Sequence, residues 1–481
     1  MALDLEGFDQ KVSGGVVNVV VEENHPLIRL CHSLPWQELL EVMLPDLKET
    51  KRLLWWVGRP LRIRVHLGIY LLQILYNLTD REAENSLRDN AAFRIFCGFG
   101  YLKQWHVPDH TKIEEFRSRL KPETQRQLAN LIAVHAVKLK YANPTKLDID
   151  STVQEANIAY PSIANLLVKV AVLAKRLVKP LAKIAGKGLD YYQVNLKRIK
   201  ALALYYFSVK RKDKSIGKEI LKDLWRDVFA NVLPILKDSH FLIKPFQEPK
   251  FWNLRRVLEQ LQWRGYHLLN QLHQEFFEGK KHEVNLYSLH AYDVHAFNKN
   301  KLNKKLEFGR AYQLGRIEGN FLYIGKCDSL HMPDAQSLPP MVEEHEFLFG
   351  KEILQSIAVD KGYYALSNQL LLEDKRIKEI GLPRPSRVLD APNYNPGMGV
   401  TEKLHNRRAG IEPLIGHLKQ GWQMGRSRMK SDTTTLSAGY SSVLGFNLRQ
   451  LKRYLTGEAI LNSESNNRKE DKQDRWLFYG T

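Results

Sequence analysis

Apolar residues recur with helical spacing through the first third of the chain. The pattern predicts helices from about residue 59 to 140, and the capping boxes Thr79-x-x-Glu82 and Thr111-x-x-Glu114 mark two helix starts. In such a box, a hydroxyl and a carboxylate bond the first free amide groups of the helix. Short helices with capped turns are typical of a helix-turn-helix that binds DNA, and equally of a helical bundle that only packs or dimerises.

Two longer apolar stripes follow between residues 161 and 282. Their members step by three and four positions, which predicts antiparallel long helices with one buried face each. The stripes are Leu166, Val170, Leu173, Leu177, Leu181 and Ile184, and then Leu254, Leu258, Leu261, Leu268, Leu272 and Phe276. We expect Pro180 and Pro234 to kink or break these helices, because proline lacks the amide donor that a helix interior requires.

Strand-like patterns occur in three other places. Residues 145–153 alternate apolar and polar side chains, which predicts a strand with both of its aspartates on one face. A second alternating stretch surrounds Gly319-Asn320, a pair typical of a hairpin turn. A third, short apolar run ends at Asp360. These segments predict a sheet in the second part of the chain.

The remaining segments complete the expected order of elements. Residues 342–355 read as a helix that leads into the third strand, and SRVLD at 386–390 is a further strand candidate. Residues 402–420 read as a helix that Pro413 either kinks or begins. The polar end, residues 456–481, has the composition of a disordered tail.

Composition adds information about partners and compartment. A formal net charge of +19 and a pI of about 9.5 imply a polyanionic partner, in the first place nucleic acid. Cys31, Cys97 and Cys327 are too widely spaced for a disulfide framework or a zinc-binding motif. We find no apolar run long enough to span a membrane, and the acidic N-terminus does not resemble a signal peptide. We therefore expect a soluble intracellular protein.

The charge is unevenly distributed. Residues 1–50 hold nine Asp and Glu against three Lys and Arg, and either pack on the helices that follow or form an arm. Residues 161–215 hold 13 Lys and Arg against Asp190 and Asp213, a net of +11. Basic side chains opposite an apolar stripe can simply be a solvated face, but this excess favours a surface that follows DNA.

Candidate chemistry lies in the stretch HNRRAGIEPLIGHLKQGW. Arg408, Glu412 and Lys419 are separated by four and seven residues, so a continuous helix at about 100° per residue places them within roughly 40° of one another. A carboxylate between two cations suits a phosphodiester held beside a metal ion, and a pair of surface ion pairs is the simpler alternative. Arg407, one step away, points about 100° from Arg408 and away from this stripe.

Two further carboxylates lie at predicted strand ends. Asp150 follows Leu147, Asp148 and Ile149, and Asp360 follows Val359. The carboxyl end of a strand is a common place for a functional site in a sheet of parallel strands. A single aspartate there is more often a turn former or a helix cap. Three acids placed on two predicted strand ends and one basic helix arise by chance much less often than a single acid does.

At these residues the chain resembles the DDE transposases of bacterial insertion sequences, whose catalytic domain has a ribonuclease-H-like fold. DIDSTVQEANIAYPS is similar to the first-acid block, VDKGYYA to the second, and the Arg-x3-Glu-x6-Lys spacing to the third. RPLRIRVHLGIYLLQILYNLTDREAENSLRDNAAFRIFCGF and VPDHTKIEEFRSRL resemble the helical N-terminal domain of this group, and the resemblance covers most of residues 50–455. His405 stands where the third block often has a tyrosine, so no role of that tyrosine is transferred.

The resemblance implies a fold of the α+β or α/β class. A helical N-terminal domain would precede a ribonuclease-H-like catalytic domain with a mixed sheet, in which the strand of Asp150 lies beside the strand that leads to Asp360. The expected parts are an arm (1–50), a helical domain that is a candidate for DNA binding (51–140), the catalytic domain (141–455) with a basic helical insertion between its first and second strands (161–282), and a polar tail (456–481).

The same resemblance implies that Asp150, Asp360 and Glu412 are the catalytic and metal-binding residues. Three carboxylates offer the hard oxygen ligands that two Mg²⁺ ions prefer, and Mn²⁺ can substitute for them. Asp150 would be shared between the two ions. Asp148, on the same strand face, is its rival, and the Ser-Thr pair that follows Asp150 favours Asp150.

Expected DNA contacts come from two regions. Arg408, Lys419 and Lys361 would orient phosphates at the catalytic acids. In the basic insertion, the candidates are Lys197, Arg198, Lys200 and Lys210. Trp422 could stack on an unpaired base, or more simply fill the core.

Taken with the resemblance, these features predict a transposase that cleaves the ends of an insertion sequence and joins them to target DNA. The expected partners are terminal-repeat DNA, target DNA and a second copy of the chain in a homodimer, with no membrane. The expected location is the bacterial cytoplasm, in association with the nucleoid. Two other classes stay open: a metal-dependent endonuclease that cuts without joining, and a DNA-binding protein with an idle site. Acids at all three positions argue against the last.

Overall fold

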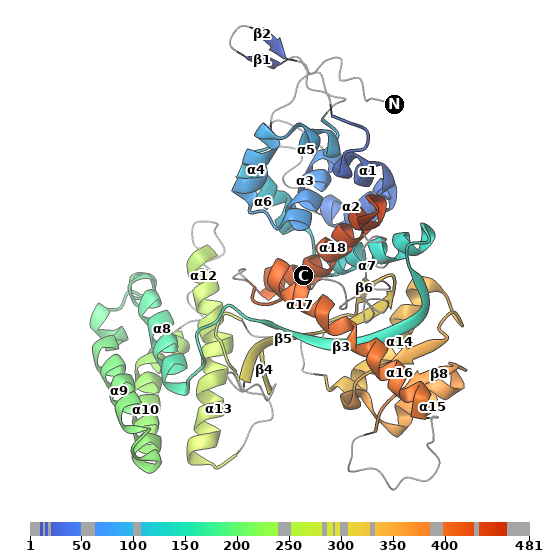
Figure 1. The fold of residues 1–481 in the computed structure, drawn as a ribbon. Coiled ribbons are helices and arrows are strands. Elements are labelled where there is room, and N and C mark those ends of the chain that lie inside the picture. Colours follow the sequence, from blue (N-terminus) through green and yellow to red (C-terminus); the bar gives the residue numbers. More distant parts are fainter. Residues whose placement is uncertain are drawn as a thin grey trace, which may run out of the picture. The chain divides into compact units, whose positions relative to one another are not determined.

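The chain forms two compact units (Figure 1). The computed structural model describes residues 10–12, 15–17, 21–49, 63–99, 107–238, 252–280, 286–291, 294–298, 306–327, 332–384, 398–427 and 432–458. The first unit comprises Met1–Glu155, Ala311–Met429 and Thr433–Thr481, and the second comprises Ala156–Arg310 and Lys430–Asp432. The domain boundaries expected from the sequence stay predictions.

A short hairpin and a group of helices begin the first unit. The hairpin is β1 (Gln10–Val12) and β2 (Gly15–Val17), and the helices are α1 (Pro26–Ser33), α2 (Trp36–Glu49), α3 (Ile63–Tyr76), α4 (Asp80–Asp89), α5 (Ala91–Phe96), α6 (His110–Arg119) and α7 (Pro122–Lys138). Helix α3 is apolar around its whole circumference, and most of its side chains are buried. Such a helix lies at the centre of a bundle, and the other helices surround it.

One of the two predicted capping boxes is present. The Thr79 hydroxyl accepts the amide of Glu82, and the Glu82 carboxylate accepts the amide of Thr79, so α4 begins as predicted. The second box is wrong. Asp109 caps α6 by accepting the amide of Thr111, so the helix begins at His110. An aspartate before the threonine offers the stronger, charged acceptor for the same amides.

A mixed sheet follows the helices. Its strands are β3 (Asn143–Glu155), β4 (His295–Asn298), β5 (Leu306–Glu318), β6 (Phe321–Ile324), β7 (Ser356–Ala358) and β8 (Glu379–Gly381). In the first unit they lie in the order β6, β5, β3, β7, β8. The β5–β6 pair is antiparallel, and the β3–β7 and β7–β8 pairs are parallel. The expected strand over 145–153 and its position beside the strand leading to Asp360 are therefore confirmed.

The predicted hairpin is also confirmed. Strands β5 and β6 are joined at Gly319 and Asn320, which have φ values of 96° and 61°. A side chain at position 319 would meet the Tyr141 carbonyl oxygen at 2.3 Å, so glycine is required there for two reasons.

Helices of the first unit flank the sheet. They are α14 (Asp334–Phe349), the 3-10 helix η6 (Lys361–Tyr363), α15 (Leu366–Asp374), α16 (Met398–Ala409), α17 (Ile411–Gly421) and α18 (Asp432–Leu455). The predicted helix at 342–355 is wrong in its bounds: α14 begins earlier and contains Pro339 and Pro340, and Gly350 ends it with a φ of 109°. The SRVLD candidate lies outside the described residues, and β8 was not predicted, because three residues are too few to show a period.

The expected helix over 402–420 is divided in two. Gly410 separates α16 from α17, and Pro413 lies in the first turn of α17. Proline is tolerated there because the first amides of a helix have no partner within the helix. Of the two predicted alternatives, a kink or a helix start, the structure shows a helix start at Pro413.

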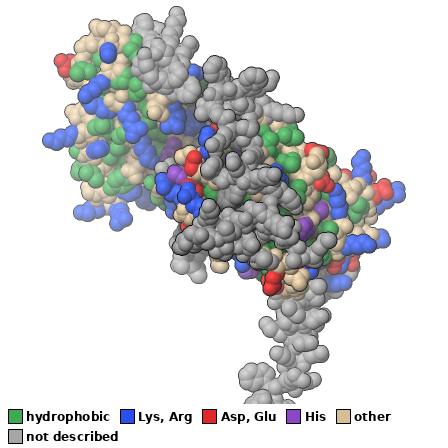
Figure 2. All heavy atoms as spheres, turned by 90° about the horizontal axis from the view of Figure 1, so that it is seen from above, with side chains coloured by type: hydrophobic (Ala, Val, Ile, Leu, Met, Phe, Trp, Pro, Cys, Tyr) green, Lys and Arg blue, Asp and Glu red, His purple; other side chains and the backbone are tan. Residues whose placement is uncertain are grey.

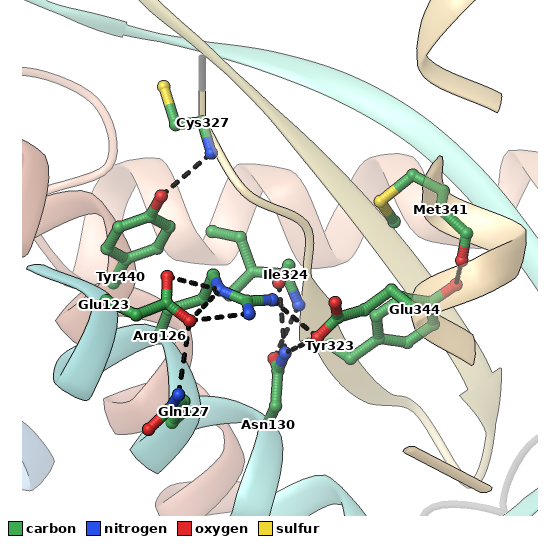
Figure 3. A network of polar contacts seen from close by, with 10 residues as sticks. All are labelled: Glu123, Arg126, Gln127, Asn130, Tyr323, Ile324, Cys327, Met341, Glu344 and Tyr440. Carbon is green, nitrogen blue, oxygen red and sulfur yellow. Dashed lines mark hydrogen bonds and ion pairs between the residues drawn. The ribbon is translucent and has the colours of Figure 1, made fainter. Parts of the chain in front are cut away.

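The N-terminal helices and the sheet share one hydrophobic core, with contributions from α3, α7, β3, β6 and α18. A polar network in the same region joins α7 to β6 and α14 (Figure 3). Arg126 forms ion pairs with Glu123 at 2.7 Å and Glu344 at 2.5 Å. The side chain of Asn130 bonds both the carbonyl oxygen and the amide of Ile324, at 3.1 and 2.8 Å. These bonds hold helix α7 against the backbone of strand β6.

The second unit is mainly helical and has its own core. Its helices are α8 (Ile163–Ala185), the 3-10 helix η2 (Leu189–Tyr192), α9 (Leu196–Val209), α10 (Lys214–Asp238), α12 (Trp252–Glu259), the π-helical turn η5 (Gln260–Gly265) and α13 (Tyr266–Phe277). Strand β4 pairs with the beginning of β5 within this unit. The first predicted apolar stripe is buried along α8 from Leu166 to Leu181. Pro180 and Pro234 break neither helix, since α8 and α10 continue through them.

Candidate active site

Strand β3 brings the first predicted acid to the edge of a parallel strand pair. Leu147 and Ile149 are fully buried on one face of β3, while Asp148 and Asp150 occupy the other face. The β3–β7 register pairs Asp148 with Ala358. Two residues further along each chain, Asp150 lies within β3, just beyond the part that pairs with β7, and Asp360 lies just after the end of β7. Because the two strands are parallel, both acids lie beyond the same end of the β3–β7 pairing.

Asp148 is held by two guanidinium groups. Its Oδ2 accepts from Arg316 Nη2 at 2.6 Å and Nε at 2.9 Å, and its Oδ1 accepts from Arg407 Nε at 2.8 Å. Asp148 is only 3% exposed. Both of its oxygens are therefore engaged in structural ion pairs, which separates its role from that of Asp150.

Arg407 connects several elements of the first unit. Its Nη1 donates to Ser356 Oγ in β7 at 2.6 Å, and its carbonyl oxygen accepts from Arg316 Nη2 at 2.6 Å. Helix α16 is thus attached to β3, β5 and β7. Arg407 and Arg408 contact different partners, as their different helical directions predict, and the face of α16 that carries Arg407 packs on the sheet. Arg316 was missed entirely, since its partner lies 168 residues away.

Arg408 joins the first acid to the third. Its Nη1 lies 3.3 Å from Asp150 Oδ2, and its Nη2 lies 2.7 Å from Glu412 Oε1. Arg408 is 8% exposed. The continuous helix assumed for Arg408 and Glu412 is interrupted at Gly410, yet Gly410 has helical torsion angles, so the i,i+4 contact between the two side chains is kept. Two of the three predicted acids are therefore brought together through one cation.

Asp360 is exposed and caps η6 by accepting the amide of Lys361 at 2.8 Å. The turn is anchored by Tyr363, whose buried hydroxyl donates to Gln313 Oε1 at 2.6 Å. Burial raises the pKa of Tyr363, and the negative charges of Asp334, Asp150 and Asp360 raise it further. Asp150 and Asp360 thus act on the same buried phenol. Asp334, which accepts from Gln313 Nε2 at 3.3 Å, was not predicted from the sequence.

The predicted phosphate-binding cations differ in position. Lys361 is exposed directly after Asp360, and Lys419 lies half-buried in the last turn of α17. In the second unit, Lys197, Arg198 and Lys200 are exposed at the start of α9. Lys210 lies near the rings of Tyr206 and Phe207, its Nζ 5.2 and 4.6 Å from their centroids, and Arg198 bonds Asp227 at 2.6 Å.

Trp422 belongs to the core and not to a base-stacking surface. It is 9% exposed, and its indole nitrogen donates to the carbonyl oxygen of Ile74 at 2.8 Å. Of its two sequence-based interpretations, the simpler one is correct.

A divalent cation fits the acids in donor type and in charge. All three offer carboxylate oxygens, and Asp150 and Glu412 already share a positively charged group, Arg408. Among the residues that the structure describes, however, no three His, Cys, Asp or Glu side chains lie close enough together to hold one metal ion. The acids are gathered in pairs: Asp150 with Glu412 through a cation, and Asp150 beside Asp360 through the strand register.

Comparisons with known proteins bear mainly on the N-terminal helices. Residues 16–119 match the family model described as "Transposase domain (DUF772)", and this range contains α1–α6. The chain is also 25% identical over 167 residues to "Uncharacterized protein ORF8 in nfe locus" of Rhizobium meliloti, which covers 34% of this chain and 77% of that protein. No solved structure matches the chain. In the described part of the chain, every helix is too short or too polar to cross a membrane.

Proposed function

We propose that the protein is a DDE-type DNA transposase with Asp150, Asp360 and Glu412 as its catalytic acids. The observation that carries this proposal is the placement of the three acids by separate elements. Asp150 in β3 and Asp360 after β7 lie beyond the same end of a parallel strand pair, and Arg408 contacts both Asp150 and Glu412, at 3.3 and 2.7 Å. The similarity of residues 16–119 to a transposase domain supports it independently.

The sheet supports a ribonuclease-H-like catalytic domain. Its order β6, β5, β3, β7, β8 combines an antiparallel hairpin on one side of β3 with two parallel strands on the other. On this interpretation, the helical second unit is the insertion between the first strand, β3, and the second, β5. The domain assignment then follows the one expected from the sequence.

The acids have distinct tasks in this mechanism. Asp150 would hold both of two Mg²⁺ ions, or Mn²⁺ in their place, and Asp360 and Glu412 would hold one each. The ions supply activation of a water or 3′-hydroxyl nucleophile and stabilisation of the leaving oxygen. Arg408, Lys361 and Lys419 orient the phosphates, because charge-assisted hydrogen bonds fix both position and angle. The clamp of Arg316 and Arg407 on Asp148 keeps α16 and α17 at the sheet.

The second unit supplies a surface for the DNA backbone. Figure 2 shows Lys and Arg side chains gathered over its helices, at the left of the view. Lys197, Arg198, Lys200 and Lys210 lie on or beside α9. Large apolar side chains are exposed in the same unit: Leu204, Tyr205, Trp263 and Tyr266 are between 51% and 77% exposed. Cations with interspersed aromatic rings suit a nucleic-acid strand. The partners of the proposed enzyme are terminal-repeat DNA, target DNA and a second copy of the chain.

A strand-transfer assay tests the function. The donor is a duplex end with a free 3′-hydroxyl, taken from the DNA that flanks the gene, and the target is a plasmid. A transposase yields joined donor and target in Mg²⁺, and Asp150→Asn yields none. Cleaved donor without joined product would favour the endonuclease, and binding without cleavage would favour the idle DNA-binding protein.

A further inference from the structure

Arg408 occupies an unusual position for a phosphate-binding residue. Its two terminal nitrogens lie on Asp150 and Glu412, and the side chain is almost completely buried. Its Nε is also buried, and it has no hydrogen-bond partner among the described residues. The fork of the guanidinium is directed at the carboxylates themselves and not outward to solvent.

This arrangement has an electrostatic reason. Two carboxylates that approach one another repel. The Arg408 guanidinium bonds both carboxylates and offsets this repulsion. A divalent ion would do the same with the same oxygens, so the two cations compete for one place.

We infer that Arg408 is an internal counter-ion that must leave Asp150 and Glu412 before a divalent metal ion binds there; this rests on the proposed function of the acids. The structure thus corresponds to a resting state. Glu412 is 60% exposed in its side chain, so the ion can approach from that side.

A phosphate group offers Arg408 its alternative partner. Guanidinium and phosphate form charge-assisted, bidentate hydrogen bonds. DNA that attracts Arg408 away from the acids therefore favours metal binding, and metal binding favours DNA by the same factor. The site assembles only when both are present, which restrains cleavage in the absence of correctly placed DNA.

The first test measures Mn²⁺ binding alone to the DNA-free full-length protein by calorimetry. Arg408→Gln removes the competing charge, and we expect it to bind Mn²⁺ about tenfold more tightly than the wild type, equivalent to about 1.4 kcal/mol. Lys403→Gln is the matched control: it removes an exposed charge from the same helix, and the affinity should change less than about twofold because solvent screens it. Equal or weaker binding in Arg408→Gln would overturn the inference.

Asp150→Asn separates this inference from the proposed function. Mn²⁺ binding that is abolished in Asp150→Asn belongs to the proposed site, whatever Arg408 does. Binding that persists unchanged in Asp150→Asn would instead count against the metal site itself.

Arg408→Lys guards against a folding defect in the Gln variant. It keeps the charge and most of the volume, but an ammonium cannot hold two carboxylates as a fork does. Its Mn²⁺ affinity should rise by less than that of Arg408→Gln. A rise in affinity as large as that of Arg408→Gln, in a variant with an unchanged thermal unfolding midpoint, contradicts the counter-ion role, because the charge is still present.

A second measurement adds a short mixed-sequence duplex. The duplex should tighten Mn²⁺ binding to the wild type more than to Arg408→Gln, in which there is nothing left to release. Equal tightening in both proteins would overturn the coupling.

Discussion

At the scale of single residues, two aspartates on one strand face have opposite environments. Asp148 is buried between Arg316 and Arg407, whereas Asp150 has 18% of its side chain exposed and contacts Arg408. A buried carboxylate with two guanidinium partners cannot be removed without leaving buried charge unpaired. The first is suited to holding elements together, and the second to binding something from outside.

This difference predicts different outcomes for the same substitution. Asp148→Asn should lower the free energy of unfolding by about 3–5 kcal/mol, because both arginines lose their counter-ion. Asp150→Asn should lower it less, because Asp150 has one arginine partner, at 3.3 Å, and that arginine keeps Glu412 as a counter-ion. Urea unfolding followed by circular dichroism measures both.

Cleavage of end DNA completes the comparison. Under the proposed function, Asp150→Asn, Asp360→Asn and Glu412→Gln each abolish cleavage while DNA binding is kept. A stable Asp148→Asn protein without activity, beside an active Asp150→Asn protein, would reverse the assignment of the two aspartates.

The sequence could predict which face of β3 carries the acids, but not which acid is structural. Alternation along one strand is local, and it defines the face of Asp148 and Asp150 without any knowledge of partners. The decision depends on Arg316 and Arg407, which reach Asp148 from β5 and α16. Helix periodicity gave Arg407 a direction but could not tell that the sheet lies on that side.

At the scale of elements, the junction of α16 and α17 determines where Arg408 and Glu412 lie. Pro413 revealed a helix start in this region, but the position of the break depends on packing around Gly410. A Cβ at Gly410 would lie 2.2 Å from Arg316 Nη1 and 3.1 Å from the Arg407 carbonyl oxygen. The junction at Gly410 is therefore packed directly against the arginine that binds Asp148.

Two glycine substitutions test this packing. Gly410→Ala should displace Arg316 and lower the free energy of unfolding by about 1–3 kcal/mol, the usual cost of overpacking. Gly416→Ala is the control: it lies within α17, nothing lies within 4 Å of the added Cβ, and it should stabilise the protein by up to about 1 kcal/mol. Equal effects of the two substitutions on the urea midpoint would mean that the junction is not tightly packed.

The packing of α14 against the start of β3 predicts a pH dependence. His345 is fully buried and bonds the Pro144 carbonyl oxygen through Nε2 at 2.9 Å, and burial lowers its pKa from 6.5 to about 4. Between these pH values the unfolded chain binds a proton at this imidazole and the folded chain does not, so folded stability falls as the pH drops through this window.

The wild type should lose about 2 kcal/mol from this group between pH 7 and pH 5. The His345→Gln variant should be less stable than the wild type at pH 7. Its free energy of unfolding should fall less between pH 7 and pH 5, by the amount that His345 contributes. Urea unfolding at the two pH values measures the difference, with the exposed His405→Gln variant as a control that keeps the wild-type dependence. Parallel losses in the wild type and His345→Gln would exclude His345 as the cause.

At the scale of the whole molecule, local sequence patterns predict the second unit better than the first. Helical stripes predicted the second unit well, because each stripe is a local pattern and the unit has a core of its own. The first unit joins segments from the beginning, middle and end of the chain around one core. Strand β8 and the partners of Asp148 depend on that long-range assembly, and no local pattern encodes them.

The second unit gives the last prediction, which concerns DNA binding as a whole. Replacing Lys197, Arg198, Lys200 and Lys210 with Gln should weaken binding to DNA of any sequence. The slope of log affinity against log salt concentration should become shallower by roughly 0.9 for each phosphate that the protein no longer neutralises, because fewer counter-ions are released. The pair Arg198→Gln with Asp227→Asn is the matched control, since it removes the ion pair seen at 2.6 Å without changing the net charge. Fluorescence anisotropy at several salt concentrations measures both variants. A slope that stays at the wild-type value in the fourfold variant would mean that these cations lie on a solvated face of α9 and do not contact DNA.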